Sequence, residues 1–325
     1  MGEVMRGSCP VRSFATRCAQ LGLPLRRTAA PVQAGKAAQA RALGAAQEEF
    51  LTMQFCSRLA FVAVLAVFGL GAASAGAVPL LPHKATYRLS LDGSKPSGQL
   101  EEMNGLIQYE ITGDACAGYS TLTRQESLAS TGEGSPLRQA VTSKAWEDGA
   151  AQAYRFLSTS TGDDGDEKIE ASVERQGRDA LKVTVTQPAA RTLDLKGDIL
   201  LPTEHVKRVL AAAAAGESVL EAKVYDGAND PAKVYETLAV VGRPSTDENR
   251  IAAPAKDSLA GRTFYPVTIS YFETGGVDRA PAYVMNMQLY DNGVVGSLKI
   301  DYGKFALVGA MSTFEALKAP GGCAN

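Results

Sequence analysis

The sequence has 325 residues, of which 45% are apolar, with 33 basic and 35 acidic side chains, two histidines and five cysteines. This is enough apolar material for one large domain or two small ones, and it excludes wholesale disorder. The balanced charge lacks the basic footprint of a nucleic-acid-binding protein, and two histidines leave little for a histidine-based metal centre. The composition predicts a globular protein with no nucleic-acid partner, no metal and no other cofactor.

Residues 61–70 form an apolar run, FVAVLAVFGL, with the surroundings of a secretory signal. Arg58 precedes the run, and small residues follow it as far as Ala77. A basic start, a short apolar core and an A-x-A-like end are typical of a cleaved signal peptide. The run is too short for a transmembrane anchor, which needs about 20 apolar residues. We therefore interpret residues 53–77 as a signal peptide and residues 1–52 as an upstream extension or a disordered segment.

The charge changes sharply after the predicted cleavage site. The first 77 residues hold eight basic and three acidic residues, which leaves 25 basic and 32 acidic residues from Val78 onward. A domain with this acidic excess is not suited to bind a phosphate backbone or anionic lipid head groups. We predict that residues 78–325 form a single exported domain.

Only Cys116 and Cys323 remain after the predicted cleavage. Two cysteines allow one pairing, and an oxidising compartment favours a disulfide between them. The alternatives are a catalytic thiol or a metal pair, but the sequence around each cysteine offers no group that would lower a thiol pKa. A bond that closes a loop over most of the domain stabilises the fold by up to about 5 kcal/mol in the chain-entropy model. A structural disulfide is the prediction.

Alternation of apolar and polar residues recurs along the whole domain. Gly, Asn and Asp separate the alternating segments, and Asn292-Gly293 favours a tight hairpin turn between two of them. Such strands bury one face and expose the other, and many short ones indicate an antiparallel barrel or a long curved sheet. The predicted strands cover residues 84–91, 107–111, 117–126, 139–147, 152–160, 168–173, 181–185, 219–225, 234–241, 264–272, 283–289, 295–300 and 305–308.

One segment breaks this alternation and predicts a helix from about Thr203 to Ala215. Thr203 follows Pro202 and suits an N-cap, and Gly216 suits the position that follows the last turn. Apolar residues recur at helical spacing between these ends. The helix either lines or plugs the concave side of the sheet, or it is an ordinary part of the packing.

An apolar row in the predicted strand 283–289 is the candidate ligand groove. Methionine adapts to irregular space and is common at hydrophobic binding surfaces. The row either lines a groove for an acyl chain or a lipoprotein segment, or it belongs to the packed interior that every barrel needs. The candidate residues are Tyr283, Met285, Met287 and Leu289, with Phe264 and Phe272 near them in the sequence.

No catalytic residue and no metal ligand is predicted. His83 is interpreted as the end of a strand and His205 as a residue on the solvent side of the helix. Glu147 and Asp148 are adjacent on a strand and point to opposite faces, which does not suit a glycosidase pair. Trp146 is interpreted as a core aromatic residue at the end of the same strand.

Taken together, these features resemble the EipB family of periplasmic cell-envelope integrity proteins over roughly residues 80–325. The resemblance implies a mainly β fold, a large open, spiral-like antiparallel β-barrel with one inserted α-helix and one disulfide, here at Cys116 and Cys323. It also implies a periplasmic location and a role in envelope maintenance. The matching residues are His83-Lys84-Ala85-x-Tyr87, Gly105-x-x-x-Tyr109, Cys116, Thr123-Arg124-Gln125, Trp146-Glu147-Asp148-Gly149, Leu201-Pro202-Thr203-x-His205 and Cys323.

The leading functional hypothesis is a non-enzymatic periplasmic protein that supports envelope integrity. It would bind a hydrophobic or envelope-derived ligand, such as a lipid or lipoprotein segment, or an envelope partner protein. A second hypothesis is a structural scaffold whose core is filled and whose outer surface docks envelope partners. A third is a periplasmic hydrolase with an unrecognised site.

Overall fold

The structure is a computed structural model that describes residues 78–98, 100–131, 135–163, 165–275 and 280–319. All of these residues belong to one compact unit, Ala75–Asn325. The predicted upstream extension, the predicted signal peptide and Cys323 lie outside the described residues. Among the helices that are described, none is long and apolar enough to cross a membrane.

The described residues form a mainly β fold, as predicted, with fifteen strands in one sheet. The first eight strands are β1 (His83–Leu91), β2 (Glu102–Asp114), β3 (Gly118–Ser130), β4 (Leu137–Glu147), β5 (Ala153–Gly162), β6 (Glu167–Arg175), β7 (Ala180–Gln187) and β8 (Arg191–Lys196). The others are β9 (Ile199–Leu200), β10 (Val219–Tyr225), β11 (Val234–Val241), β12 (Phe264–Glu273), β13 (Tyr283–Tyr290), β14 (Val295–Asp301) and β15 (Ala306–Ala316).

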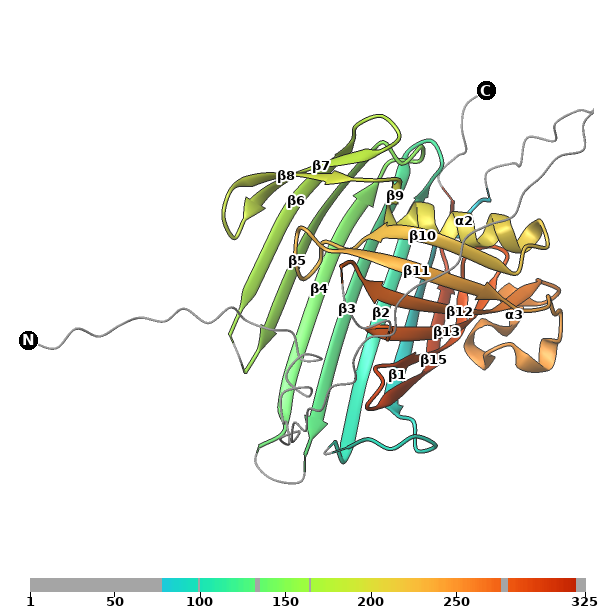
Figure 1. Ribbon diagram of the computed structural model, residues 1–325. Helices are drawn as coiled ribbons and strands as arrows, with labels where there is room; N and C mark the ends of the chain where they lie inside the picture. Colours follow the sequence, from blue (N-terminus) through green and yellow to red (C-terminus); the bar gives the residue numbers. More distant parts are fainter. Residues whose placement is uncertain (1–77, 99, 132–134, 164, 276–279, 320–325) are drawn as a thin grey trace, which may run out of the picture. The chain divides into compact units, whose positions relative to one another are not determined.

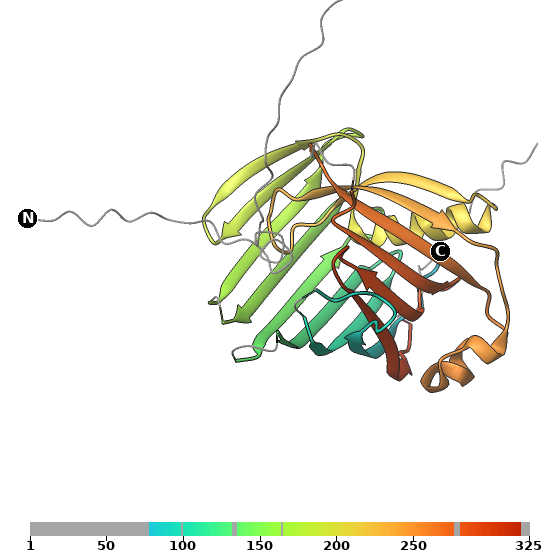
Figure 2. The same cartoon turned by 60° about the horizontal axis from the view of Figure 1, so that its bottom comes forward.

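The sheet curls into a nearly closed barrel. Its strand order is β8-β7-β6-β5-β4-β3-β2-β1-β15-β14-β13-β12-β11-β10-β9, and all neighbours are antiparallel except the short β9–β10 pair. The long strands β2 to β6 cross the shorter strands β10 to β13 at a steep angle (Figures 1 and 2). The two ends of the sheet, β8 and β9, are not neighbours in this order, so hydrogen bonds do not complete the ring.

Side chains hold the two ends of the sheet together instead. One core cluster joins Phe156 and Val173 of the first half to Ile199, Tyr225 and Val234 of the second. The ring of Tyr225 meets the ring of Phe156 edge-on, with centroids 6.2 Å apart. With this packing the barrel is nearly closed, whereas the resemblance implied an open one.

Helix α2 (Pro202–Ala214) confirms the helix predicted between β9 and β10. Its C-terminal end is as predicted, because Gly216 has a φ of 78° and follows the last turn. The N-terminal end of the helix differs from the prediction. Thr203 lies within the first turn, and its backbone N–H is bonded by the carboxylate of Glu147 on β4, 2.7 Å away. The prediction of Thr203 as the N-cap was wrong, since a distant strand supplies the cap.

A second helical segment joins β11 to β12 and was not predicted. It contains two 3₁₀ turns, Glu248–Arg250 and Ala253–Ala255, and the four-residue helix α3 (Lys256–Leu259). The described residues therefore hold two α-helices instead of the predicted one. The helix α3 is too short to show helical periodicity in the sequence. In both views α2 and α3 lie toward the same end of the barrel (Figures 1 and 2).

All thirteen predicted strands are present, and the hairpin turn at Gly293 is confirmed. Gly293 has a φ of 85°, and its N–H bonds to the carbonyl of Tyr290 across the turn at 2.9 Å. Strands β8 and β9 were not predicted. β8 is short and exposed along most of its length, and β9 has only two residues.

Candidate functional site

The register of β12 and β13 sets which side chains share the inner face of the barrel. Tyr271 lies opposite Tyr283, and Ile269 lies opposite Met285. Directly opposite residues of an antiparallel pair point to the same side of the sheet, and side chains two positions apart do so as well. Tyr283, Met285, Met287 and Leu289 therefore form one row that faces the same side as Ile269.

Helix α2 covers only part of this face. Val209 and Leu210 of the helix share a core cluster with Ile269 and Leu289, and Leu289 is only 3% exposed. The next residues of the row are less covered: Tyr283, Met285 and Met287 are all half-buried. We name the less covered part of this surface the tyrosine–methionine face. It consists of Tyr235, Tyr271, Tyr283, Met285 and Met287, all of which are half-buried.

The tyrosines of this face are packed against one another. The rings of Tyr271 and Tyr283 are stacked with centroids 4.4 Å apart and an interplanar angle of 15°. Tyr235 meets both rings edge-on, at 5.8 and 5.7 Å. Tyr302 extends the row, with its centroid 6.1 Å from that of Tyr283. These contacts fix the ring positions, so the surface they present is preformed.

The half-buried carboxyl of Asp226 lies close enough to these rings to affect their ionisation. Burial raises the pKa of Tyr235 to about 12, and the charge of Asp226 contributes to the shift. The same two causes raise the pKa of Tyr271. Burial also raises the pKa of Asp226, against the N–H of Ala228 and the charge of Lys233. At neutral pH the phenols are uncharged, so this end of the face combines apolar rings with neutral hydroxyls.

The other two residues of the predicted groove lie elsewhere. Phe264 and Phe272 are separated from Val267 and Tyr271 by odd numbers of positions, so they point to the opposite side of β12. Phe264 is buried against Leu259 of α3, and Phe272 is half-buried on the outer surface of the sheet. The six residues therefore do not line one groove, because a strand divides its side chains between two faces.

Helix α2 is fixed to the inner face of β4 by Glu147. The two carboxylate oxygens accept the backbone N–H groups of Thr203 and Glu204, each at 2.7 Å. Glu147 is 3% exposed. Burial raises its pKa to about 7, against the two backbone hydrogen bonds, which lower it. The N-terminal end of a helix attracts negative charge, so this side chain both caps and orients α2.

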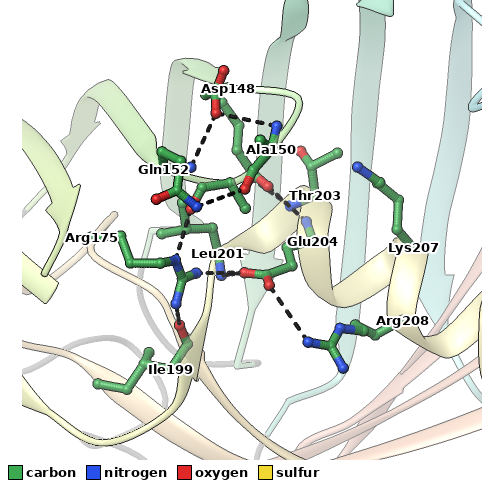
Figure 3. Close-up of polar contacts among 12 residues, drawn as sticks. Asp148, Ala150, Gln152, Arg175, Ile199, Leu201, Thr203, Glu204, Lys207 and Arg208 are labelled. Carbon is green, nitrogen blue, oxygen red and sulfur yellow. Dashed lines mark hydrogen bonds and ion pairs between the residues drawn. The ribbon is translucent and has the colours of Figure 1, made fainter. Parts of the chain in front are cut away.

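Arg175 of β6 makes a second attachment to the same end of α2 (Figure 3). Its guanidinium lies 2.6 Å from the carboxylate of Glu204, and it also donates to the carbonyls of Ala151 and Ile199 at 2.8 and 3.2 Å. In the same view Arg208 approaches Glu204 from the next turn of the helix at 4.0 Å. These three contacts of Arg175 hold α2, β9 and the β4–β5 turn against β6.

Both histidines are buried: His83 begins β1, as predicted, whereas His205 was predicted on the solvent side of the helix. His83 is stacked on Phe314 at 5.5 Å, and its Nδ1 is 2.7 Å from the carbonyl of Leu81. His205 is 4% exposed and faces the interior instead of solvent, and burial lowers its pKa to about 4. Each is a neutral imidazole at pH 7. Trp146, expected in the core, is half-buried on the outer face, with the guanidinium of Arg155 4.6 Å from its ring centre.

Sequence reasoning missed the functions of Glu147, Arg175 and Asp226. In β4, Glu147 lies on the same face as Ala145, at a position where the alternation predicts an apolar residue. A carboxylate at such a buried position indicates a capping or binding role. Arg175 likewise occupies the next position on the buried face of β6, after Val173. Asp226 gave no such signal, because it lies directly after a strand, where aspartate is common.

Cys116 lies in the turn between β2 and β3. The pairing with Cys323 stays a prediction, because Cys323 is outside the described residues.

Three comparisons with known proteins agree on a family. The chain is 30% identical over 281 residues to the cell envelope integrity protein EipB of Brucella abortus (strain 2308), which covers 82% of this chain and 96% of that protein. Its fold is similar to the crystal structure of a β-barrel-like protein with a domain of unknown function from Brucella abortus, with a TM-score of 0.67 and 27% identity. That match covers 74% of this chain and 99% of the other. A family model for EipB-like proteins matches residues 74–318, and the chain therefore belongs to the EipB-like family.

Proposed function

We propose that this protein is a non-enzymatic, periplasmic binding protein that supports cell-envelope integrity. It takes up a hydrophobic or amphipathic envelope ligand, such as a lipid or the lipid-bearing segment of a lipoprotein, on its tyrosine–methionine face. The envelope role is proposed from the similarity to the cell envelope integrity protein of Brucella abortus. The periplasmic location is proposed from the signal-like segment at residues 53–77.

One observation supports a binding role more than any other: the apolar inner row of β13 is only partly covered. Tyr283, Met285 and Met287 sit in the middle of a fifteen-stranded sheet, yet each is half-buried, whereas Leu289 of the same row is enclosed by α2. Apolar surface left open inside a fold is costly unless something covers it. Two thioethers next to a fixed group of phenols suit an acyl chain with a polar end.

The contacts of Glu147, Glu204 and His83 support a non-enzymatic role. The carboxylate of Glu147 is used by two backbone N–H groups of α2, and that of Glu204 by Arg175. His83 is engaged by the carbonyl of Leu81. Groups held in this way serve the packing of the helix and strands.

Ligand binding is tested on the processed protein. Native mass spectrometry of protein purified from the periplasm should show a co-purified lipid-like mass, and a fluorescent long-chain fatty acid should bind saturably. Replacing both methionines in the variant M285Q/M287Q should weaken this binding about tenfold, because two apolar contacts are lost. The matched control is Val240→Gln, on the outer face of β11, where the side chain is 45% exposed. This variant should bind as the wild type does.

Complementation of a deletion strain tests whether ligand binding on this face is needed for envelope integrity. Wild type and Val240→Gln should restore resistance to detergent, and M285Q/M287Q should not. A ligand-free mass spectrum with no fatty-acid binding would support the scaffold hypothesis instead. Full rescue by M285Q/M287Q would contradict the proposal that this face carries the function.

A further inference from the structure

Half of strand β10 is an unpaired sheet edge. β10 pairs with β11 along its whole length, Val219–Tyr225. On its other side it pairs with β9 only at Lys223 and Val224. In the part of the chain that the structure describes, the segment 219–222 therefore has no strand on its outer side. A free edge presents main-chain N–H and C=O groups that another strand can pair with.

The two edges of the sheet differ in how they are protected. The other edge strand, β8, carries Arg191, Asp194 and Lys196 within six residues, and such charges discourage pairing with other chains. The free segment of β10 reads Val-Leu-Glu-Ala, with Glu221 as its one charged residue. Val219 is 52% exposed beside Val240, its direct partner on β11. This edge therefore carries fewer charges that would oppose pairing with another strand than β8 does.

A groove of about 940 Å³ runs along this edge. Four consecutive residues of β10 line it. Because alternate side chains of a strand point to opposite faces, the groove contacts both faces of β10. The groove continues over the outer surface to Leu238 and Phe272, and Arg208 of α2 lies on its other side. Its lining from β10 is Leu220, Glu221, Ala222 and Lys223, and β9 contributes Leu200.

The charges around the groove favour a basic occupant. Asp198, Glu221, Glu236 and Glu273 are the acidic residues that line it, against Arg208 and Lys223. Lys223 lies 3.7 Å from Glu236, and Lys233 lies 2.7 Å from Glu273, so two of the four carboxylates have a lysine neighbour. Asp198 and Glu221 are left to attract positive charge from an incoming chain.

We propose that this groove, which we name the β10 groove, binds an extended peptide segment of another protein by strand addition. The peptide pairs its main chain with residues 219–222, places apolar side chains on the side of Leu220, and places basic side chains on the opposite side, near Glu221. Main-chain pairing supplies affinity in this mode of recognition, and the alternate side chains supply specificity. The proposal concerns a different surface from the tyrosine–methionine face and does not depend on it.

A second copy of this chain fits the groove less well. In the antiparallel register that sets the two Glu221 residues directly opposite each other, like charges lie across the strand pair, which is unfavourable. The same charges attract a lysine-bearing peptide.

The test uses the processed full-length protein and three blocked hexapeptides. The first alternates lysine with valine, the second alternates glutamate with valine, and the third has the first sequence with every second main-chain nitrogen methylated. Fluorescence anisotropy should show binding of the lysine peptide, and both other peptides should bind at least about tenfold more weakly. Hydrogen exchange should show new protection at residues 219–222 when the lysine peptide is bound.

A variant of the protein with a reversed charge in the groove tests the same proposal. Glu221→Lys should weaken binding of the lysine peptide about tenfold. Glu170→Lys, at an exposed position of β6, is the control and should bind as the wild type does. The proposal is overturned if the lysine peptide does not bind, if all three peptides bind equally, or if protection appears elsewhere. Self-association at high protein concentration that protects residues 219–222 without peptide would assign the edge to a second copy.

Discussion

At the scale of single residues, Glu147 is the unusual group in this fold. It is an acidic side chain on the inward row of β4, and it is enclosed between the strand and the first turn of α2. Two opposing effects act on it. Burial favours the neutral carboxyl, whereas the N–H groups of Thr203 and Glu204 favour the carboxylate. The nearby charge of Glu204 adds to the effect of burial, and the balance raises the pKa from 4.5 to about 7.

This shift predicts a stability contribution that depends on pH. The folded-state pKa lies above the unfolded value, so the native state holds its proton more tightly. The contribution is fully present below the unfolded pKa of 4.5 and is lost as the pH rises through about 7. Glu147→Gln mimics the protonated form, so the free energy of unfolding of the variant relative to wild type should rise by about 3 kcal/mol from about pH 5 to about pH 8. Urea denaturation at the two pH values measures this difference.

Comparison with a variant removes the effects of other titrating groups. His205, whose pKa is lowered by burial, makes the fold more stable as the pH rises toward 6.5, in the opposite direction. This term is common to wild type and Glu147→Gln and cancels in their difference. Glu170→Gln, on the exposed face of β6, should follow the wild-type pH curve. A constant difference between Glu147→Gln and wild type across this range would contradict the assignment.

At the scale of elements, α2 depends on the sheet for its position. The first turn of the helix is bonded by Glu147 of β4 and by Arg175 of β6, and Lys207 donates to the carbonyl of Gly149 at 2.9 Å. Because α2 encloses part of the inner row of β13, these attachments also determine how much of the tyrosine–methionine face stays open. The helix is thus held by contacts that bridge strands far apart in the sequence.

Removing Arg175 should loosen this attachment. Arg175→Met leaves the carboxylate of Glu204 and the carbonyls of Ala151 and Ile199 without the guanidinium. The pair is largely enclosed, with side chains 9% and 18% exposed. We expect a loss of about 3 kcal/mol in the free energy of unfolding at neutral pH, measured by urea denaturation. Arg208→Met removes the longer, exposed ion pair to Glu204 and should cost no more than about 0.5 kcal/mol. Equal effects of the two substitutions would show that Arg175 does not anchor the helix.

The elements themselves are largely predictable from the sequence, but their partners are not. Alternation marks a strand such as β6 because one face is buried, and Gly216 marks the end of α2 because its φ is positive. The same alternation places Tyr283 and Met285 together and Phe272 on the other side, which the predicted groove overlooked. The capping of α2 by Glu147 is a contact between distant residues, and no local pattern around Thr203 encodes it. β8 escaped prediction because an exposed edge strand buries too little to show a clear period.

At the scale of the whole molecule, the barrel has a point of weakness where its sheet ends. Hydrogen bonds connect β8 to β9 through thirteen intervening strands, but between the two ends the ring is closed by the short link 197–198 and by packed side chains such as Phe156 and Tyr225. Packing of this kind is undone when the sheet uncurls. A covalent bond between early and late parts of the domain would limit the conformations of the unfolded chain and oppose its opening.

The strand register is compatible with a disulfide between Cys116 and Cys323. His83 at the start of β1 pairs with Ile111 of β2 on one side and with Ala316 of β15 on the other. The ends of β2 and β15 thus lie at the same end of the barrel, two strand spacings or about 10 Å apart. Cys323 follows Ala316 after a stretch of chain that can extend roughly 20 Å, which is enough to reach the turn that holds Cys116.

We therefore predict that the processed, oxidised protein has no free thiol when it is denatured and titrated with a thiol reagent. Cys323→Ser should expose one thiol, at Cys116, and should lower the free energy of unfolding by about 4 kcal/mol because the unfolded chain gains conformational freedom. The variant C116S/C323S is the matched control. If the two sulfurs form one bond, each single substitution already removes it, so the double variant should be about as stable as Cys323→Ser. Two reactive thiols in the oxidised wild type, or additive losses of stability in the double variant, would refute the pairing.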